Sequence, residues 1–117
     1  MNRLSCGIDI VKVDRITNEL AERILGDKEA SIYNSFLNES RKREFAAGRF
    51  AAKEAFVKAL NLKELDFKSI QFINDEAGCP IPDDTLKKVV DVSEISVSIS
   101  HEHDYAVAVV VMLKGED

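Results

Sequence analysis

The sequence has little of what marks a secreted or fibrous protein. Its two cysteines, Cys6 and Cys79, are too few for a disulfide framework and lack the CxxC spacing of zinc sites, so we expect free thiols. No tract rich in proline, glycine or serine marks a linker, and we find no internal repeat. A chain of 117 residues, 45% hydrophobic and 32% charged, is long enough to bury one core. We therefore expect a single domain over residues 1–117.

Long hydrophobic runs are also missing. The apolar run 105–113 is far shorter than the ~20 residues that a membrane-spanning helix needs. Residues 1–11 lack the basic-then-apolar layout of a signal peptide. We expect no membrane partner and a location in the cytoplasm, which also suits free thiols.

Positive charge is scarce overall but concentrated in one stretch. The formal net charge of −5 argues against a general nucleic-acid binder, because such proteins need clustered lysine and arginine for the phosphate backbone. Residues 41–58 nevertheless hold six basic side chains and two acidic ones, a net of +4 that leaves −9 for the rest of the chain. A local basic face on an acidic protein favours a small anionic ligand or an acidic partner surface. A solvated helix face is the simpler alternative.

The first third of the chain predicts a strand followed by two helices. Residues 4–11 alternate in polarity, which is typical of a strand, and Asp9 falls on its less apolar face. The alternate apolar residues are expected in the core: Leu4, Cys6, Ile8 and Ile10. Residues 13–25 have a helical repeat of four, and Gly26 is suited to end that helix. A second short helix is expected over 28–37.

The remainder predicts a long helix and then mainly strands. Ser40 can open a helix that runs to about Leu60, with Gly48 as a tolerated weak point. Further segments are expected in this order: a strand over 67–74, a turn over 75–80, a short helix over 83–91, and a hairpin of strands 95–100 and 105–113 joined by 101–104. This order of elements predicts an α+β fold.

The long helix carries two charges on a face of small residues. Ala47, Ala51, Glu54 and Lys58 follow one another at helical spacings, so the charges share a face on which the alanines allow something to approach closely. An ordinary Glu–Lys helix pair, worth roughly 0.2 to 0.5 kcal/mol, is the structural alternative. Asp9 has a similar alternative, as the cap of the next helix.

These charged residues in combination indicate a cation site. Asp9 at the end of a core strand, Glu54 on the helix and Lys58 nearby are the groups needed to hold a hard divalent cation against a pyrophosphate. Mg²⁺ prefers oxygen ligands and is usually bound by one or two carboxylates together with substrate phosphates. A lysine can then neutralise charge on the leaving group.

Two histidines follow the strand over 95–100. The His101-x-His103 spacing could provide a zinc pair, although carboxylates from elsewhere would have to complete the ligand set. We favour a role for His101 as a donor to a phosphate. The structural alternative is a turn histidine bonded to Asp104 or to backbone.

Three segments resemble a known family. The blocks 7-GIDIVKVDRI-16, 46-AAGRFAAKEAFVKAL-60 and 97-VSISHEHDYAVAVVV-111 are similar to the signatures of the holo-acyl carrier protein synthases, the small bacterial 4'-phosphopantetheinyl transferases. The resemblance implies the family's fold, an antiparallel sheet packed against a long central helix, in subunits of a homotrimer. It also implies transfer of 4'-phosphopantetheine from coenzyme A to a serine of apo-acyl carrier protein in fatty acid biosynthesis, with release of adenosine 3',5'-bisphosphate.

The resemblance also implies roles for particular residues. Asp9 and Glu54 match the family's Mg²⁺ ligands, and Lys58 matches a lysine associated with the coenzyme A phosphates and with catalysis. His101 matches a contact to a coenzyme A phosphate. Four arginines are implied to face the carrier protein or the nucleotide: Arg15, Arg23, Arg41 and Arg49. The sites are implied to form between subunits.

Two other functions fit parts of the pattern. A non-catalytic interaction domain on the same scaffold would use Asp9 and Glu54 structurally. A metal-dependent nuclease is disfavoured by the acidic balance and by the single carboxylate pair.

Overall fold

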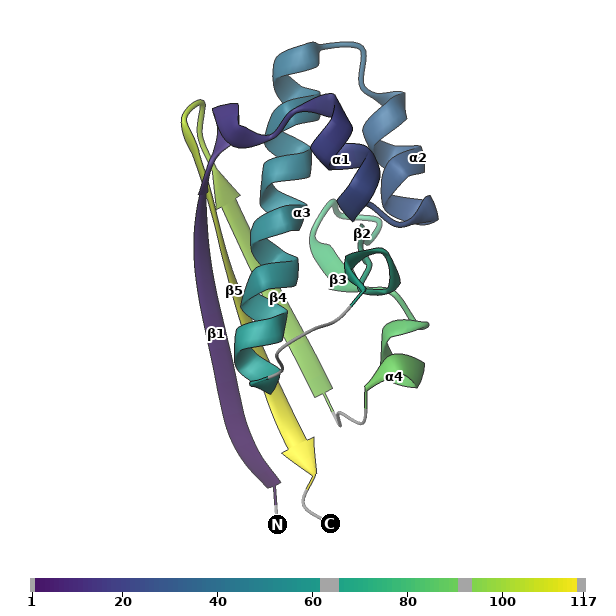
Figure 1. Ribbon diagram of the computed structural model, residues 1–117. Helices are drawn as coiled ribbons and strands as arrows, with labels where there is room; N and C mark the ends of the chain where they lie inside the picture. The colour runs from purple at the N-terminus through teal and green to yellow at the C-terminus, as the bar shows by residue number, and fades with distance from the viewer. Residues whose placement is uncertain (1, 62–65, 91–93, 116–117) are drawn as a thin grey trace.

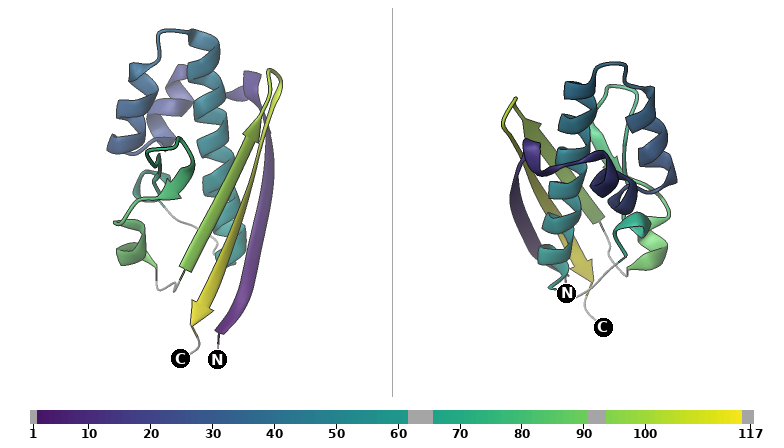
Figure 2. Two further views of the ribbon diagram at one scale, coloured as in Figure 1. Left: turned by 180° about the vertical axis from the view of Figure 1, so that it is seen from behind. Right: turned by 45° about the horizontal axis from the view of Figure 1, so that its top comes forward.

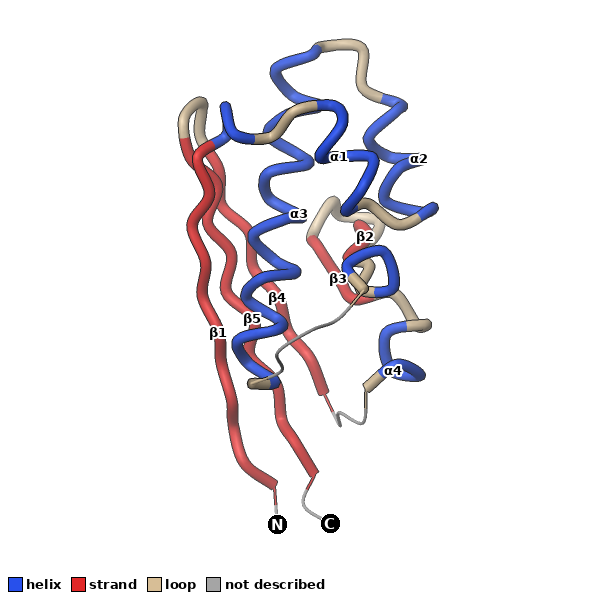
Figure 3. Tube along the Cα trace, viewed as in Figure 1, coloured by secondary structure: helices blue, strands red, loops and turns tan. Residues whose placement is uncertain are grey.

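The protein is an antiparallel sheet with a long helix laid across one face (Figures 1 and 3). The structure, a computed structural model, describes residues 2–61, 66–90 and 94–115. Its main sheet has the order β1-β5-β4, with all neighbours antiparallel. The three strands are β1 Asn2–Lys12, β4 Glu94–His101 and β5 Tyr105–Gly115. The predicted α+β class, with an antiparallel sheet against a long central helix, is confirmed.

The long helix α3, Glu39–Leu60, begins and ends with recognisable caps. The side chain of Asn38 accepts the backbone N–H of Arg41 at 3.1 Å, so Asn38 is the N-cap and the prediction of Ser40 is wrong by two residues. Asn61 ends the helix in the left-handed conformation, with φ of 57°. The predicted end near Leu60 is confirmed.

Helix α3 crosses the sheet from β4 towards β1. A Cβ atom on Gly48 would lie 2.8 Å from Cγ2 of Ile99 on β4, so the first half of α3 contacts that strand. A Cβ atom on Gly7 of β1 would lie 2.0 Å from the carbonyl oxygen of Ala55. Only glycine fits at position 7, because the helix backbone lies directly against the strand. The close approach places the second half of α3 over β1.

The remaining elements cover the other side of α3, so the molecule has three layers (Figures 1 and 2). They are η1 Val13–Arg15, α1 Asn18–Ile24, α2 Asp27–Ser35, η2 Phe67–Ser69, the two-stranded sheet of β2 Phe72–Asn74 and β3 Pro80–Pro82, and α4 Leu86–Val89. Within the described ranges, no helix is both long and apolar enough to cross a membrane.

Capping interrupts the helix that was predicted over 13–25. Ile16 and Thr17 are extended, and the Thr17 hydroxyl accepts the backbone N–H of Leu20 at 3.1 Å. Thr17 thus starts a new helix, α1, instead of continuing the turn η1. Gly26 follows α1 as predicted and also serves as the N-cap of α2, which confirms the second helix.

The segments after α3 differ more from expectation. Only Phe72–Asn74 of the predicted strand 67–74 is extended, and its partner Pro80–Pro82 was not predicted. The turn predicted over 75–80 is confirmed up to Cys79, with Gly78 at φ +88°, and Pro80 already belongs to β3. The helix predicted over 83–91 is limited to Leu86–Val89, and position 91 lies outside the described residues.

The predicted core face of β1 is wrong. Leu4, Ile8 and Ile10 are 74%, 62% and 64% exposed, whereas Gly7 and Val11 are buried beneath α3. The face towards the helix carries the smaller residues because α3 lies so close to the strand. In the antiparallel register, paired residues of β1 and β5 share a face. The outer sheet face therefore consists of these exposed side chains: Leu4, Cys6, Ile8, Ile10, Tyr105 and Val111.

Candidate active site

Two carboxylates and a lysine come together where α3 crosses β1. Asp9 lies on β1, and Glu54 and Lys58 lie on α3. Nζ of Lys58 donates to Oδ1 of Asp9 at 3.0 Å and to the carbonyl oxygen of Ile8 at 3.0 Å. The lysine therefore bonds across to β1, and Asp9 caps no helix. Because β1 is an edge strand, this cluster lies at the border of the sheet, where a ligand or a partner can reach it.

The electrostatics of Glu54 reflect this crowding. Burial raises the pKa of Glu54, and the charge of Asp9 raises it further, while Lys58 and then Arg15 act in the opposite direction. The carboxylates therefore lie close enough to repel each other, and Arg15 contributes to the same field. Such a pair is stabilised by any cation placed between the two groups.

The donor set fits a hard divalent cation that is shared with a ligand. Among the described residues, no group of three or more histidine, cysteine, aspartate or glutamate side chains comes together as a metal cage. Asp9 and Glu54 supply carboxylate oxygens, and Mg²⁺ typically takes one or two of these with water and phosphate oxygens completing its shell. The two residues therefore fit the Mg²⁺ that the sequence predicts.

The alanines on the face of α3 that carries Glu54 and Lys58 pack against other parts of the protein. Ala47 and Ala51 are fully buried in the hydrophobic core, so no ligand can reach their methyl groups. The small residues do allow a close approach, as predicted, but what approaches is the rest of the protein and not a ligand. They instead let α3 pack closely, and this packing carries Glu54 and Lys58 to Asp9.

Three other predicted residues line a second hollow. Arg41, Arg49 and His101 contribute to a cavity of about 410 Å³ between α3, the end of β4 and the turn after β2. Phe36 also lines it and lies beneath the Arg41 guanidinium, 5.7 Å from the ring centroid. Two arginines and a histidine around a hollow of this size suit a phosphorylated ligand.

Arg49 is firmly held in the wall of that hollow. Its Nε donates to the carbonyl oxygen of Phe72 at 3.0 Å, and its Nη2 donates to Oδ1 of Asn74 at 2.5 Å. The guanidinium also stacks over the Phe45 ring, 4.3 Å from its centroid. Burial lowers the pKa of Arg49 to about 10, against the opposing charge of Glu29. Arg49 therefore stays charged at neutral pH in a fixed pose.

His101 has a different partner from the one considered in the sequence. Its Nδ1 lies 2.9 Å from Oε1 of Glu44, so the bonded carboxylate is on α3 and is not Asp104. This contact joins the last residue of β4 to the helix.

One chain does not bring the two clusters together. Asp9 pairs with Ala108 of β5, and Ala108 pairs with Ile99 of β4, so β5 separates the cluster on β1 from the hollow beside β4. Two strand spacings amount to about 10 Å. Arg23 is exposed on α1 and belongs to neither cluster.

The sequence analysis missed a buried ionic network. Lys53, counted there among the charges of a basic stretch, is fully buried, and its Nζ donates to Oε1 of Glu29 at 2.6 Å. Residues 41–58 therefore do not form one basic face. The available signal was that, apart from Glu54, the neighbours of Lys53 from Ala51 to Phe56 are apolar.

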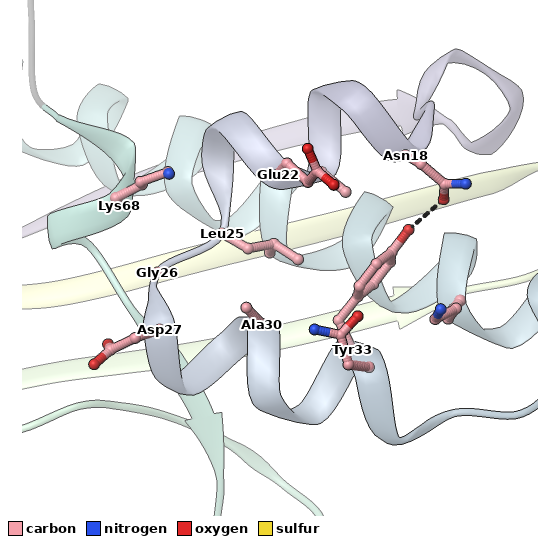
Figure 4. A pocket seen from close by; sticks show the side chains of 11 residues that line it. Asn18, Glu22, Leu25, Gly26, Asp27, Ala30, Tyr33 and Lys68 are labelled. Carbon is pink, nitrogen blue, oxygen red and sulfur yellow. Dashed lines mark hydrogen bonds between the residues drawn. The ribbon is translucent and has the colours of Figure 1, made fainter.

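A larger hollow contains none of the predicted site residues. It measures about 780 Å³ and lies between α1 and α2, where Tyr33 Oη donates to Asn18 Oδ1 at 2.6 Å (Figure 4). Its floor includes Leu25 and Ala30, and its residues provide no cluster of catalytic groups. Size alone therefore does not locate the chemistry in this chain.

Fold and sites together define a class of protein. A long helix across a three-stranded sheet, a carboxylate pair with a lysine at the sheet edge and a separate arginine–histidine hollow are suited to a polyanionic ligand that binds with a cation. The family model of the 4'-phosphopantetheinyl transferase superfamily matches residues 5–110. The chain belongs to this superfamily, which confirms the resemblance seen in the sequence.

Individual relatives agree with this assignment. The chain is 42% identical over 78 residues to a holo-[acyl-carrier-protein] synthase of Petrotoga mobilis, an alignment that spans 67% of this chain and 65% of that protein. A synthase of Staphylococcus saprophyticus is 46% identical over 83 residues, which cover 63% of this chain and 72% of the relative.

Solved structures of the same class superpose over nearly the whole chain. A holo-(acyl-carrier-protein) synthase from Bacillus anthracis, in complex with CoA (3',5'-ADP), has a TM-score of 0.82 at 38% identity and covers 95% of this chain and 96% of its own. The Helicobacter pylori synthase in complex with coenzyme A has a TM-score of 0.76 at 30% identity, over 92% of this chain and 98% of that one.

Proposed function

We propose that this protein transfers 4'-phosphopantetheine from coenzyme A to a serine of apo-acyl carrier protein, with Mg²⁺, as a step of fatty acid biosynthesis. The observation that supports this most directly is that Asp9 of β1 meets Glu54 and Lys58 of α3, which follow it in the sequence by 45 and 49 residues. The relatives named above carry this activity in their names, and two related structures hold coenzyme A or its nucleotide portion. The exposed free cysteines fit a reaction in the cytoplasm.

The proposed reaction assigns a role to each residue of the first cluster. Asp9 and Glu54 would hold Mg²⁺, which supplies charge stabilisation to phosphate oxygens when bound. The serine oxygen attacks the β-phosphorus of coenzyme A, and the bond to the bridging oxygen breaks to release adenosine 3',5'-bisphosphate. A Glu54 carboxylate oxygen would accept the serine proton. Lys58 places positive charge beside the departing phosphate.

The remaining predicted residues bind the two substrates. Arg41, Arg49 and His101 hold phosphates of coenzyme A in the second hollow. Arg15 and Arg23 are exposed on η1 and α1, where their charge can attract an acidic carrier protein.

We place the complete site between subunits of a homotrimer. Each chain separates its two clusters, so a neighbouring copy can bring its arginine–histidine hollow to the carboxylates at the β1 edge. The outer sheet face supports this assembly, since it exposes a contiguous set of apolar side chains beside that edge. Burying these side chains against other copies removes them from water.

A charge on the outer sheet face should break the assembly. We expect Ile8→Glu to yield monomers and to lower transfer by about tenfold or more, because an unpaired carboxylate is costly to bury. Sedimentation velocity measures the assembly, and the same samples are assayed for transfer. Ser31→Glu, on the exposed surface of α2, is the matched control and should remain trimeric and active. An Ile8→Glu protein that stays trimeric, or a wild-type monomer with full activity, contradicts the proposal.

Mass spectrometry tests the activity itself. Apo-acyl carrier protein incubated with this protein, coenzyme A and Mg²⁺ should gain the mass of one phosphopantetheine group. A matched sample with a chelator should gain none, because the carboxylate pair then lacks its cation. Tight binding of the carrier protein with no mass gain in either sample would support a non-catalytic interaction domain instead.

A further inference from the structure

The second hollow contains one group that does not suit a phosphate ligand. Among the described residues that line it, Glu44 is the one carboxylate, beside the cationic Arg41 and Arg49. A fixed negative charge repels a phosphate within the Debye length of about 8 Å at physiological salt. The Glu44 side chain is only 19% exposed, so water screens it incompletely. Simple electrostatics therefore predicts that Glu44 weakens ligand binding.

The contact of Glu44 suggests what offsets this repulsion. Oε1 of Glu44 lies 2.9 Å from Nδ1 of His101. A carboxylate can only accept, so Nδ1 donates to Glu44, and in the imidazolium form of the ring Nε2 carries a second N–H that can donate to a phosphate oxygen. One carboxylate thus fixes the ring orientation and leaves Nε2 to face the ligand.

The two residues differ in how far their side chains are exposed. His101 ends β4, is paired with Ala106 of β5, and has a side chain that is 48% exposed. Glu44 lies well inside α3, one turn before Gly48, where the helix packs directly on Ile99. Glu44, held between the helix and the sheet, therefore fixes the side chain of the more exposed histidine.

We propose that Glu44 is a positioning residue, which holds His101 so that Nε2 is presented to a phosphate of the nucleotide. This inference rests on the proposed function, since it takes the phosphates of adenosine 3',5'-bisphosphate as the ligand. Fixing the ring before binding removes an ordering cost that the ligand would otherwise bear. A purely structural contact between α3 and β4 would behave differently. Its removal would lower stability and leave nucleotide binding unchanged.

Titration calorimetry with adenosine 3',5'-bisphosphate and Mg²⁺ tests the inference. Repulsion alone predicts that removing the Glu44 charge strengthens binding, whereas a positioning role predicts that it weakens binding. His101→Ala should weaken binding about tenfold and Glu44→Ala about three- to tenfold, with the double variant no weaker than His101→Ala, because the two residues act as a unit. Glu44→Gln keeps an acceptor for Nδ1 and should bind within about twofold of wild type. Glu44→Asp keeps the charge but not the reach, and should resemble Glu44→Ala.

Glu102 offers a matched control for charge alone. It is exposed next to His101, and its side chain makes no hydrogen bond within the described part of the chain. Glu102→Ala should leave binding unchanged or strengthen it, because it removes only a repelling charge. Thermal melts of every variant confirm folding.

The outcomes separate this inference from the function. A wild-type protein that does not bind the nucleotide overturns both. A wild type that binds, with Glu44→Ala equal to it or tighter, overturns the positioning role and leaves the function standing. A His101→Ala protein that binds as wild type has the same result, since there is then no donor to position.

Discussion

Lys53→Met should lower the free energy of unfolding by about 3–5 kcal/mol, the range measured when one partner of a buried ion pair is removed. Lys53 and Glu29 are both fully buried, and their charged atoms lie 2.6 Å apart. Burial raises the pKa of Glu29 and lowers that of Lys53, while each partner acts against the shift of the other. The substitution leaves Glu29 as a carboxylate inside the core without its counter-charge.

The loss extends beyond the pair, because Lys53 and Glu29 bind several backbone segments. Nζ of Lys53 also donates to the carbonyl oxygen of Phe67 at 2.6 Å and to that of Ile70. The Glu29 carboxylate accepts the backbone N–H of Gly26 at 3.0 Å and that of Phe72 at 2.8 Å. The network thus joins α3 to α2, η2 and β2, and an apolar side chain satisfies none of these groups.

Urea denaturation at a fixed subunit concentration measures this effect, since association contributes to apparent stability. Lys88→Met is the control: Lys88 is exposed, and its replacement should change the free energy of unfolding by about 0.5 kcal/mol or less. Replacing both Lys53 and Glu29 by methionine should recover only part of the loss, because backbone groups of Gly26, Ile70 and Phe72 lose their side-chain partners. A Lys53→Met loss below about 1 kcal/mol would show that the network is dispensable.

The regular elements were predictable because their periodicity is strong. Strict alternation over 95–100 predicts β4, an apolar run over 105–113 predicts β5, and a long run of helix-forming residues predicts α3. The face of β1 was not predictable in the same way. Hydrophobicity places Leu4 and Ile8 inside, yet the backbone of α3 lies so close to β1 that no side chain fits at Gly7. Alternation shows that a strand has two faces, but the packing partner decides which one is buried.

The first cluster was predictable from residue types and spacing. Asp9, Glu54 and Lys58 formed one hypothesis of a cation site, to which the family resemblance added roles, and the structure brings these residues together. No local pattern links Glu44 to His101, which are 57 positions apart, because a contact of that range depends on tertiary structure. Lys53 was missed for a related reason. Charged residues are usually exposed, and only the carboxylate of Glu29, 24 positions away, allows this lysine to be buried.

Asp9→Asn and Glu54→Gln should each lower the rate of phosphopantetheine transfer by about a thousandfold, the ratio expected from several kcal/mol of lost metal-assisted stabilisation. Each substitution keeps the size of the side chain and removes the negative charge that a Mg²⁺ ligand provides. Half-maximal activity should also require more Mg²⁺.

Stability should change in the opposite direction to activity. Because burial and Asp9 raise the pKa of Glu54 in the folded protein, ionised Glu54 destabilises the fold at neutral pH. The neutral amide in Glu54→Gln relieves this, so the melting temperature should stay the same or rise while activity is lost. Asparagine at position 9 still offers an oxygen to Lys58 and also removes the repulsion between the carboxylates.

Measuring transfer and thermal melting on the same samples distinguishes a functional pair from a structural one. Asp84→Asn, at an exposed carboxylate before α4, is the matched control and should change neither quantity. A structural role predicts a lower melting temperature with near-normal turnover in both site variants. That result would contradict the assignment of Asp9 and Glu54 to the metal site. When residues that a protein keeps for function at a cost in stability are neutralised, activity falls while the melting temperature stays the same or rises.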